Sequence, residues 1–232
     1  MEPRFFLPGA PLAGLLTLCP EDEAHVTRVL RMKKGEKLTV CDGAGREAAC
    51  EWTGGGASVL SVRDCECEPA CAVHLYPSLA KGERFEWMIQ KAVELGAASV
   101  TPVYSGRCIA RMPDQNRLVR WRRIAREAAC QCGRGILSEI FPAIDFDAAA
   151  RSAPGVKIFC YEEAAEGSLP RALGSGSVFS VFTGPEGGYT PEESALAAAQ
   201  GCVTVTLGRR ILRCETAPLF VLAALEYEAL RG

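Results

Sequence analysis

Two glycine-rich loops carry the residue types that could bind a flat, charged ligand. The first, "FTGPEGGYTPEE" at residues 182–193, places three glycines and the carboxylate of Glu186 between a β-type run and a helix start. The second, "LGRRILRCETAP" at residues 207–218, follows another β-type run. Glycine lets backbone N–H and C=O groups approach a ligand closely. Loops without a lysine, beside an acid, suit a purine nucleoside with a cationic tail better than a triphosphate.

Other ligand and catalytic motifs do not match these loops. "GPEGGY" differs from the dinucleotide fingerprint, and no Gly-Lys-Ser/Thr follows it, so the P-loop interpretation is weak as well. The chain has no nucleophile elbow, and its two histidines, His25 and His74, complete no Ser/His/Asp set. Two tight turns that need positive φ would explain one glycine in each loop, but not all of "GPEGG".

The first 70 residues and the rest of the chain have different patterns of strands and helices, which predict the elements that position the loops. Within the first 70 residues, a helix expected over residues 20–36 precedes the β-type runs "KLTVCDG", "REAACEW" and "ASVLSVRDC". This pattern predicts a compact barrel, with Ala24, Val29 and Leu30 near helical spacing. From Ala72 onwards, strands and helices alternate, which predicts an α/β domain with a mostly parallel sheet covered on both faces.

Local signals define two helices of the α/β part. In "TPEESALAAAQG", Thr190 and Glu193 have the spacing of a capping box, and Pro191 stands at the first helical position. The run "GERFEWMIQKAVELG" has a helical apolar stripe and ends at a glycine. The residues of that stripe are Phe85, Met88, Ile89, Ala92 and Val93.

Composition limits the class of protein. Hydrophobic residues make up 48% of the 232 residues and charged residues 23%, which is typical of a chain that can bury a full core. No apolar run approaches the roughly 18 residues of a membrane span, and the first residues do not resemble an export signal. We therefore predict a cytoplasmic protein that does not cross a membrane. The formal net charge of −2 argues against a protein that binds nucleic acid with its whole surface.

Basic residues gather in one part of the chain. Residues 81–134 hold 11 Lys and Arg against 5 Asp and Glu, although the whole chain is slightly acidic. A local basic face on such a chain is typical of an enzyme that docks on a polyanion through one side. A solvated helix face is the alternative.

The twelve cysteines are scattered, and no CxxC pair occurs. The one cluster, "CECEPACAVH", offers Cys65, Cys67, Cys71 and His74. Zinc sites usually present a second pair of ligands further along the chain, and none follows here. We therefore predict no metal site, with reduced thiols as the default and a metal at this cluster as the alternative.

Several motifs together resemble one known family. The two loops, with "KGERFEWMIQKAVELGAASVTPVYS", "WRRIAREAACQCGR" and "HVTRVLRMKKGE", resemble the ribosomal small-subunit methyltransferase E family of the SPOUT superfamily over nearly the whole chain. The resemblance implies methylation of N3 of one uridine in 16S ribosomal RNA by S-adenosylmethionine. It also implies a PUA-like β-barrel at residues 1–70, a SPOUT α/β domain at residues 71–232 with a C-terminal trefoil knot, and a homodimer.

The resemblance and the loops predict two sets of binding residues. Residues of the two loops are expected to hold S-adenosylmethionine, and basic residues of two segments are expected to contact the 16S ribosomal RNA or the small subunit. The expected cofactor residues are Thr183, Gly184, Glu186, Gly187, Gly188, Leu207, Gly208, Ile211, Leu212 and Arg213. The expected RNA contacts are Arg28, Arg31, Lys33, Lys34, Arg120, Arg122 and Arg123.

Uracil N3 carries a proton near pH 7, so methylation needs a base or cations that stabilise the charge developing on O2 and O4. Arg213 is the candidate for the second role, although a helix cap or a dimer salt bridge would also explain it. Glu94 and Glu215 are candidate bases. Two alternatives stay open, a ribose 2′-O-methyltransferase of the same superfamily and a non-catalytic RNA-binding protein. The amino-terminal barrel and the "LRCETA" form favour the uridine-N3 branch.

Overall fold

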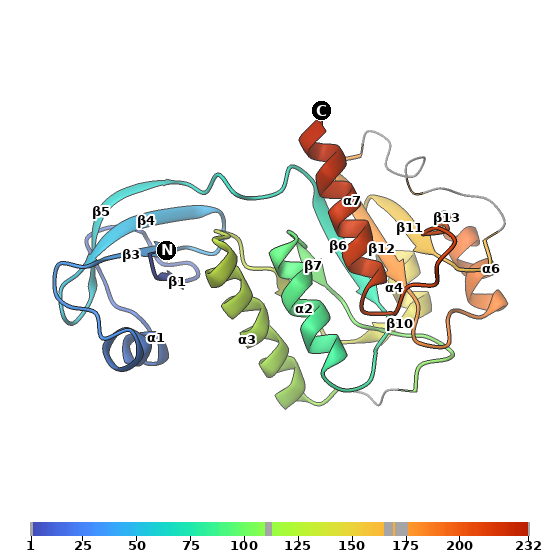
Figure 1. The fold of residues 1–232 in the computed structure, drawn as a ribbon, viewed down its shortest axis with the longest axis horizontal. Helices are drawn as coiled ribbons and strands as arrows, with labels where there is room; N and C mark the ends of the chain where they lie inside the picture. Colours follow the sequence, from blue (N-terminus) through green and yellow to red (C-terminus); the bar gives the residue numbers. More distant parts are fainter. Residues whose placement is uncertain (1, 110–112, 165–168, 170–175, 232) are drawn as a thin grey trace. The chain divides into compact units, whose positions relative to one another are not determined.

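The computed structural model describes residues 2–109, 113–164, 169 and 176–231 (Figure 1). Contacts divide the chain into two compact units. The first comprises Met1–Glu68 and Arg126–Leu137, and the second comprises Pro69–Ala125 and Ser138–Gly232. The helix α3 (Gln115–Cys132) therefore contributes residues to both units.

The first unit is built on a five-stranded sheet in the order β1-β3-β4-β5-β2. β1 pairs with β3 in parallel and the other neighbours are antiparallel. Side chains of a β-strand point alternately to its two faces. On β3 and β4 the side chains on the inner face are buried, among them Leu38, Val40, Ala48 and Trp52. The three predicted β-runs are confirmed as β3, β4 and β5. The strands are β1 (Arg4–Phe6), β2 (Leu15–Leu16), β3 (Lys37–Cys41), β4 (Arg46–Trp52) and β5 (Ala57–Asp64).

The predicted helix over residues 20–36 was wrong in length and phase. It divides into α1 (Pro20–Ala24) and a π-helical turn, η1 (His25–Val29), and φ is positive, at 53°, at Arg31. A π turn holds one more residue than an α turn, so it shifts the side chains that follow it to another face. Val29 and Leu30 are consequently exposed, and Val26 is buried in their place.

The second unit contains a six-stranded sheet in the order β13-β11-β12-β6-β7-β9, and every recorded pairing in it is parallel. The expected strand–helix alternation is thus confirmed. A separate parallel pair joins β8 and β10. The strands are β6 (Ala72–Pro77), β7 (Ser99–Val100), β8 (Val103–Tyr104), β9 (Glu139–Ile140), β10 (Ile144–Asp145), β11 (Val156–Cys160), β12 (Val178–Thr183) and β13 (Val203–Val205).

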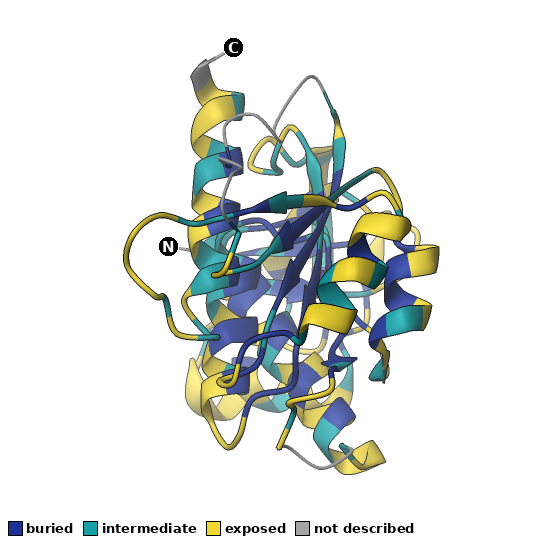
Figure 2. Ribbon diagram, turned by 90° about the vertical axis from the view of Figure 1, so that its right-hand side faces the viewer, coloured by how far each residue is buried: buried dark blue, intermediate teal, exposed yellow. Residues whose placement is uncertain are grey.

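Helices cover both faces of this sheet (Figure 2). α2 (Arg84–Glu94) packs with α7 (Ala217–Arg231), and α4 (Phe146–Ser152) packs with α6 (Pro191–Ala199) on the other side. The predicted stripe of α2 is confirmed, because all five of its apolar residues are buried. The capping box of α6 is confirmed in both of its hydrogen bonds.

Candidate cofactor-binding site

A pocket lies where three neighbouring parallel strands end. β13, β11 and β12 run side by side in the same direction, so their C-terminal loops meet at one edge of the sheet. Ligands of open α/β sheets bind at this edge. The pocket is lined by Cys160, Tyr161, Glu162, Thr183, Gly184, Pro185, Gly188, Tyr189, Thr206, Leu207, Gly208, Arg209, Arg210, Ile211, Leu212, Cys214 and Ala217.

Two glycines of the first loop lie close to neighbouring side chains of the pocket. Gly188 has φ of +68°, in the left-handed region where other residues are strained. A Cβ atom at Gly188 would collide with the carboxylate of Glu162, which belongs to the loop after β11. At Gly184, a Cβ atom would lie 3.2 Å from the Tyr189 ring. Only glycine at residue 188 therefore leaves the Glu162 carboxylate where it lies.

The pocket offers a ligand an unpaired hydroxyl and a carboxylate, beside the two arginines Arg209 and Arg210. The Thr183 hydroxyl is buried and has no hydrogen-bond partner among the described residues. Buried polar groups in proteins nearly always have a partner, so this oxygen is available to a ligand. Glu162 is the one acidic residue among the lining residues that the structure describes, and Thr206 and Leu207 extend the wall. The acid expected from the sequence was Glu186 of the first loop, but Glu162 lines the pocket instead.

Two thiols of the pocket wall are held in the neutral form. Burial raises the pKa of Cys160 to about 12. Burial, followed by the hydrogen bond to Glu215 at 3.3 Å, raises the pKa of Cys214 to about 12. The thiolate is the nucleophilic form of cysteine, so neither thiol acts as a nucleophile near neutral pH. The two residues serve as apolar wall.

Alkylation of Cys214 by iodoacetamide is expected to be slow at pH 8 in the folded protein. Its pKa lies above the usual value of 9.0, so the reactive thiolate fraction is smaller at every pH below 12 and grows as pH rises through that value. Mass spectrometry of the Cys214 peptide across a pH series measures this. The same peptide in unfolded protein is the control. Equal rates for the folded and unfolded protein at pH 8 would contradict the assigned environment.

The pocket includes most of the expected cofactor residues, but not all of them. Glu186, Gly187 and Arg213 are not among its lining residues. The Gly187 carbonyl instead accepts a hydrogen bond from Arg107 at 2.9 Å, and the Glu186 carboxylate accepts one from the backbone of Lys81 at 3.4 Å. The expected residues in the pocket wall are Thr183, Gly184, Gly188, Leu207, Gly208, Ile211 and Leu212.

Sequence reasoning missed the loop after β11. Cys160, Tyr161 and Glu162 line the pocket, although "VKIFCYEE" contains no glycine. The available signal was the strand itself, because a buried parallel strand that ends in polar residues presents them at the ligand edge.

Two of the three candidate catalytic residues, Arg213 and Glu215, line a groove outside the pocket. An open groove is lined by Arg213 and Glu215, with Arg84 and Trp87 of α2. The Arg213 side chain is 78% exposed, and its Nη1 lies 3.9 Å from Glu215 Oε1. Cys214, between them in sequence, faces the pocket. One short turn thus separates the pocket from the groove.

Glu94, the other candidate base, is held elsewhere on α2. Its carboxylate pairs with Lys91 Nζ at 2.7 Å, one turn back on the same helix. It lines neither the pocket nor the groove. Glu215 is therefore the candidate base that the structure brings to Arg213.

The expected RNA contacts fall into two groups. Arg28, Arg31, Lys33 and Lys34, at and after η1, are exposed. On α3, Arg120 pairs with Glu86 and Arg122 donates to a backbone carbonyl, at 2.7 and 3.1 Å, and Arg123 is also engaged. The first group is the more available for phosphate.

The cysteine cluster of the sequence is not assembled as a whole. His74 Nδ1 lies 2.8 Å from the Ser99 hydroxyl, and Cys67 Sγ lies 2.9 Å from the Gly133 carbonyl oxygen.

None of the helices in the described part of the chain combines the length and the apolar character needed to cross a bilayer.

Comparison with known proteins identifies the class. The model of an RNA methyltransferase domain matches residues 67–226, and that of an RNA methyltransferase PUA domain matches residues 21–56. Fold and pocket thus define a SPOUT-type RNA methyltransferase with an amino-terminal PUA domain. The ribosomal RNA small subunit methyltransferase E of Bacillus subtilis is 32% identical over 95% of this chain and 93% of its own length. The chain belongs to the ribosomal RNA small subunit methyltransferase E family.

Solved structures of similar proteins support the same family assignment. A ribosomal RNA small subunit methyltransferase E from Neisseria gonorrhoeae, bound to S-adenosylmethionine, matches with a TM-score of 0.91 and 32% identity. A Legionella pneumophila methyltransferase with the same cofactor matches with a TM-score of 0.89 and 30% identity. Each comparison covers 98% of both chains.

Proposed function

We propose that this chain methylates N3 of a uridine in 16S ribosomal RNA. Its family makes it an S-adenosylmethionine-dependent ribosomal RNA methyltransferase. The choice of N3 rests on one observation: the 207–217 loop separates the cofactor pocket from a groove that Arg213 lines. The guanidinium presents a planar fork of N–H donors. Such a fork suits the oxygens that flank N3 of uracil.

The chemistry divides between the two sides of this loop. When bound, S-adenosylmethionine supplies a methyl group already activated by its sulfonium. On the groove side, Glu215 accepts the N3 proton while Arg213 donates hydrogen bonds to the oxygen on which negative charge develops. The Glu215 side chain is only 11% exposed, so its position is constrained by its surroundings. Orientation of the base is a large part of such catalysis.

Mapping of 16S ribosomal RNA nucleosides by mass spectrometry is the direct test. Cells that carry the gene are expected to contain one N3-methyluridine that is missing from cells without it, and the purified protein with S-adenosylmethionine is expected to restore it. A 2′-O-methylated nucleotide in its place would favour the ribose branch of the superfamily. An unchanged nucleoside profile would indicate a binding protein without this activity.

We propose that RNA docks on the η1 region of the first unit. Arg28, Val29, Leu30 and Arg31 follow one another and are all exposed, so this segment offers both cationic and apolar side chains to a partner. Cations neutralise phosphates, and apolar side chains can contact unstacked bases. Arg120, Arg122 and Arg123 remain proposed contacts of lesser weight, because their interactions within the protein compete with RNA.

Substitution of both Lys33 and Lys34 by alanine is expected to weaken RNA binding and flatten its salt dependence. Each lost phosphate contact lowers the slope of log K against log salt by about 0.7–0.9. Fluorescence anisotropy with a 16S fragment at several salt concentrations measures this slope. Arg63→Ala is the matched control, because Arg63 is 74% exposed but already paired with Glu47. An unchanged slope in the double variant would show that docking lies elsewhere.

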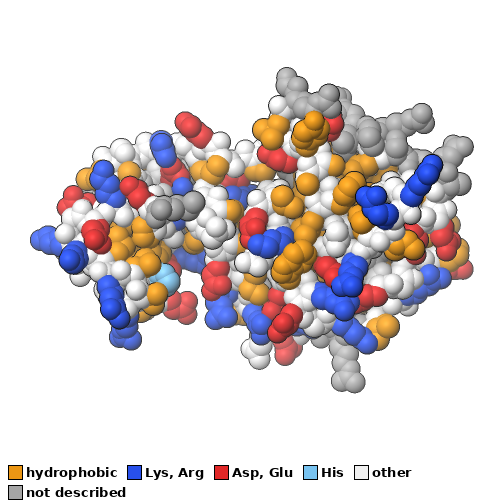
Figure 3. All heavy atoms as spheres, in the orientation of Figure 1, with side chains coloured by type: hydrophobic (Ala, Val, Ile, Leu, Met, Phe, Trp, Pro, Cys, Tyr) orange, Lys and Arg blue, Asp and Glu red, His pale blue; other side chains and the backbone are white. Residues whose placement is uncertain are grey.

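We further propose a homodimer formed through α2 and α7. Large apolar side chains on these two contacting helices are exposed (Figure 3), among them Trp87 at 46%, Phe220 at 44% and Leu230 at 78%. Apolar patches of this kind on soluble proteins mark interaction sites. The patch lies next to the Arg213 groove, because Trp87 lines both. A monomer mass at all concentrations in sedimentation equilibrium would exclude the dimer.

The trefoil knot and the cytoplasmic location also remain proposals. Support for the knot comes from family membership and from the position of β11 between β12 and β13, which brings three C-terminal loops to one pocket. An experimental chain trace through residues 156–217 tests the knot. Cell fractionation tests the location.

A further inference from the structure

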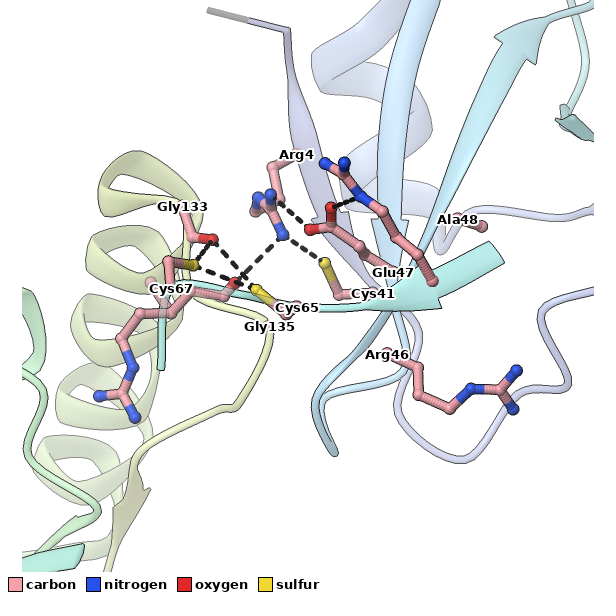
Figure 4. A network of polar contacts seen from close by, with 12 residues as sticks. Arg4, Cys41, Arg46, Glu47, Ala48, Cys65, Cys67, Gly133 and Gly135 are labelled. Carbon is pink, nitrogen blue, oxygen red and sulfur yellow. Dashed lines mark hydrogen bonds and ion pairs between the residues drawn. The ribbon is translucent and has the colours of Figure 1, made fainter. Parts of the chain in front are cut away.

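Two thiols face the same backbone carbonyl at the end of β5 (Figure 4). The chain turns after Asp64, and this turn places Cys65 Sγ 3.1 Å from Cys67 Sγ. The Gly133 carbonyl oxygen lies 2.9 Å from Cys67 Sγ and 3.8 Å from Cys65 Sγ. Three soft or polar donor atoms thus converge on one point, and Cys67 is exposed to solvent.

The surroundings hold these donors in place. A Cβ atom at Gly135 would lie 2.6 Å from the Cys65 Cβ atom, so Cys65 packs directly against the backbone there. The Glu68 carboxylate accepts hydrogen bonds from the backbone N–H groups of Gly135 and Ile136 at 2.8 and 2.9 Å. It also accepts two from Arg134, at 3.0 and 2.9 Å. The segment 133–136 is therefore fixed opposite the thiols.

The electrostatics of the cluster favour a cation. Gly133 follows directly after α3, a helix of 18 residues, and the carbonyls at a helix C-terminus carry the negative end of its dipole. Arg134 is paired with Glu68 at 2.9 Å, while Glu47 is shared between Arg4 at 2.8 Å and the exposed Arg63 at 2.7 Å. Deprotonation of both thiols adds two negative charges at this point, and a divalent cation would offset them.

We propose that Cys65 and Cys67 bind a thiophilic divalent cation such as Zn²⁺, with the Gly133 carbonyl oxygen as third donor. Each thiol releases its proton to solvent as its metal–sulfur bond forms. Zn–S bonds of about 2.3 Å in tetrahedral geometry place two sulfurs about 3.8 Å apart. The thiols therefore need to separate by only about 0.7 Å from the 3.1 Å that they now have.

Glu68 has a positioning role in this site. One of its oxygen atoms lies within 4.8 Å of both sulfurs, but each of the two oxygens already accepts two hydrogen bonds. The carboxylate holds residues 133–136 in position, while solvent completes the coordination on the exposed side. A Cys65–Cys67 disulfide is the competing outcome. It would bring the sulfurs to about 2.05 Å and would need an oxidant that the proposed activity does not supply.

Titration of the reduced full-length protein with Cd²⁺ tests the site, because Cd²⁺ gives an ultraviolet charge-transfer band when thiolates bind it. One tight equivalent is expected, and Zn²⁺ is expected to displace it. Cys65→Ser and Cys67→Ser should each weaken Cd²⁺ binding by more than the roughly 10–100-fold that loss of an outer-sphere partner costs. Cys19→Ser and Cys71→Ser, at other half-buried thiols, are the matched controls and should leave binding unchanged.

Two further measurements separate this site from general thiol binding and from misfolding. Zn²⁺ should raise the Tm of the parent protein but not that of Cys67→Ser, because a ligand stabilises only the state that it binds. The affinity for S-adenosylmethionine should be the same in all four variants. Equal Cd²⁺ affinity in the parent protein, Cys65→Ser and Cys67→Ser would overturn the proposal, as would a Cys65–Cys67 disulfide that persists under reducing conditions.

Discussion

Gly188→Ala is expected to weaken S-adenosylmethionine binding on the order of a hundredfold, which corresponds to about 2.7 kcal/mol. The added Cβ atom collides with the Glu162 carboxylate and displaces the one acid among the described pocket-lining residues. The backbone at φ of +68° is strained as well. Isothermal titration calorimetry with S-adenosylmethionine and with its demethylated product measures the loss.

Gly201→Ala is the matched control for that experiment. Gly201 has φ of +76°, so alanine there suffers similar backbone strain, but nothing lies within 4 Å of its Cβ position and it does not line the pocket. Both variants should therefore lose similar stability in thermal unfolding, while only Gly188→Ala loses the ligand. If folded Gly188→Ala binds with the parent affinity, the cofactor pocket is assigned wrongly.

Arg213→Ala is expected to lower kcat roughly a hundredfold, or about 3 kcal/mol, with little change in the affinity for cofactor or RNA. The side chain lines the groove rather than the pocket, so it should interact with the base and only as charge builds on it. Single-turnover methylation of a 16S substrate, measured beside binding titrations, separates the two effects.

Two comparisons sharpen the Arg213 test. Arg213→Lys should recover little activity, because a point charge on a flexible stem loses the planar fork. Arg151→Ala should be neutral, since Arg151 is 63% exposed and paired with Asp147 on the same helix. If Arg213→Ala retains its turnover but sediments as a monomer where the parent protein is a dimer, the residue is structural.

The sequence predicted what local rules determine. The buried stripe of α2 and the capping box at Thr190 follow from spacing within one helix, and both are confirmed. The contribution of Glu162 depends on strand order, because β11 inserts between β13 and β12. Strand order comes from long-range pairing, which a single sequence does not display. The π turn at His25 could not be predicted from hydrophobic periodicity for another reason. One extra residue in a helical turn does not change the composition of the segment.

The cysteine cluster also depends on long-range contacts that a single sequence does not display. Cys65 and His74 stand close in sequence, yet the partner of His74 is Ser99, and the partner shared by Cys65 and Cys67 is Gly133. The sequence offered four residues that lie close together along the chain, although the prediction was that they hold no metal. The fold selected two of them and added a carbonyl from 66 residues away.

The order of strands has a consequence for biosynthesis. The central strand β6 pairs with β12 from Ala72↔Val178 onwards, a separation of 178 − 72 = 106 residues, and β11 has both of its partners, β12 and β13, later in the chain. A nascent chain on the ribosome must therefore hold β6 and β11 without these partners until its last third is translated. Unpaired strand edges promote aggregation. Chains that terminate before residue 178 thus lack most of the pocket and leave one edge of β6 and both edges of β11 unpaired. Premature termination should therefore yield substrates for chaperones and proteases rather than partly active enzyme.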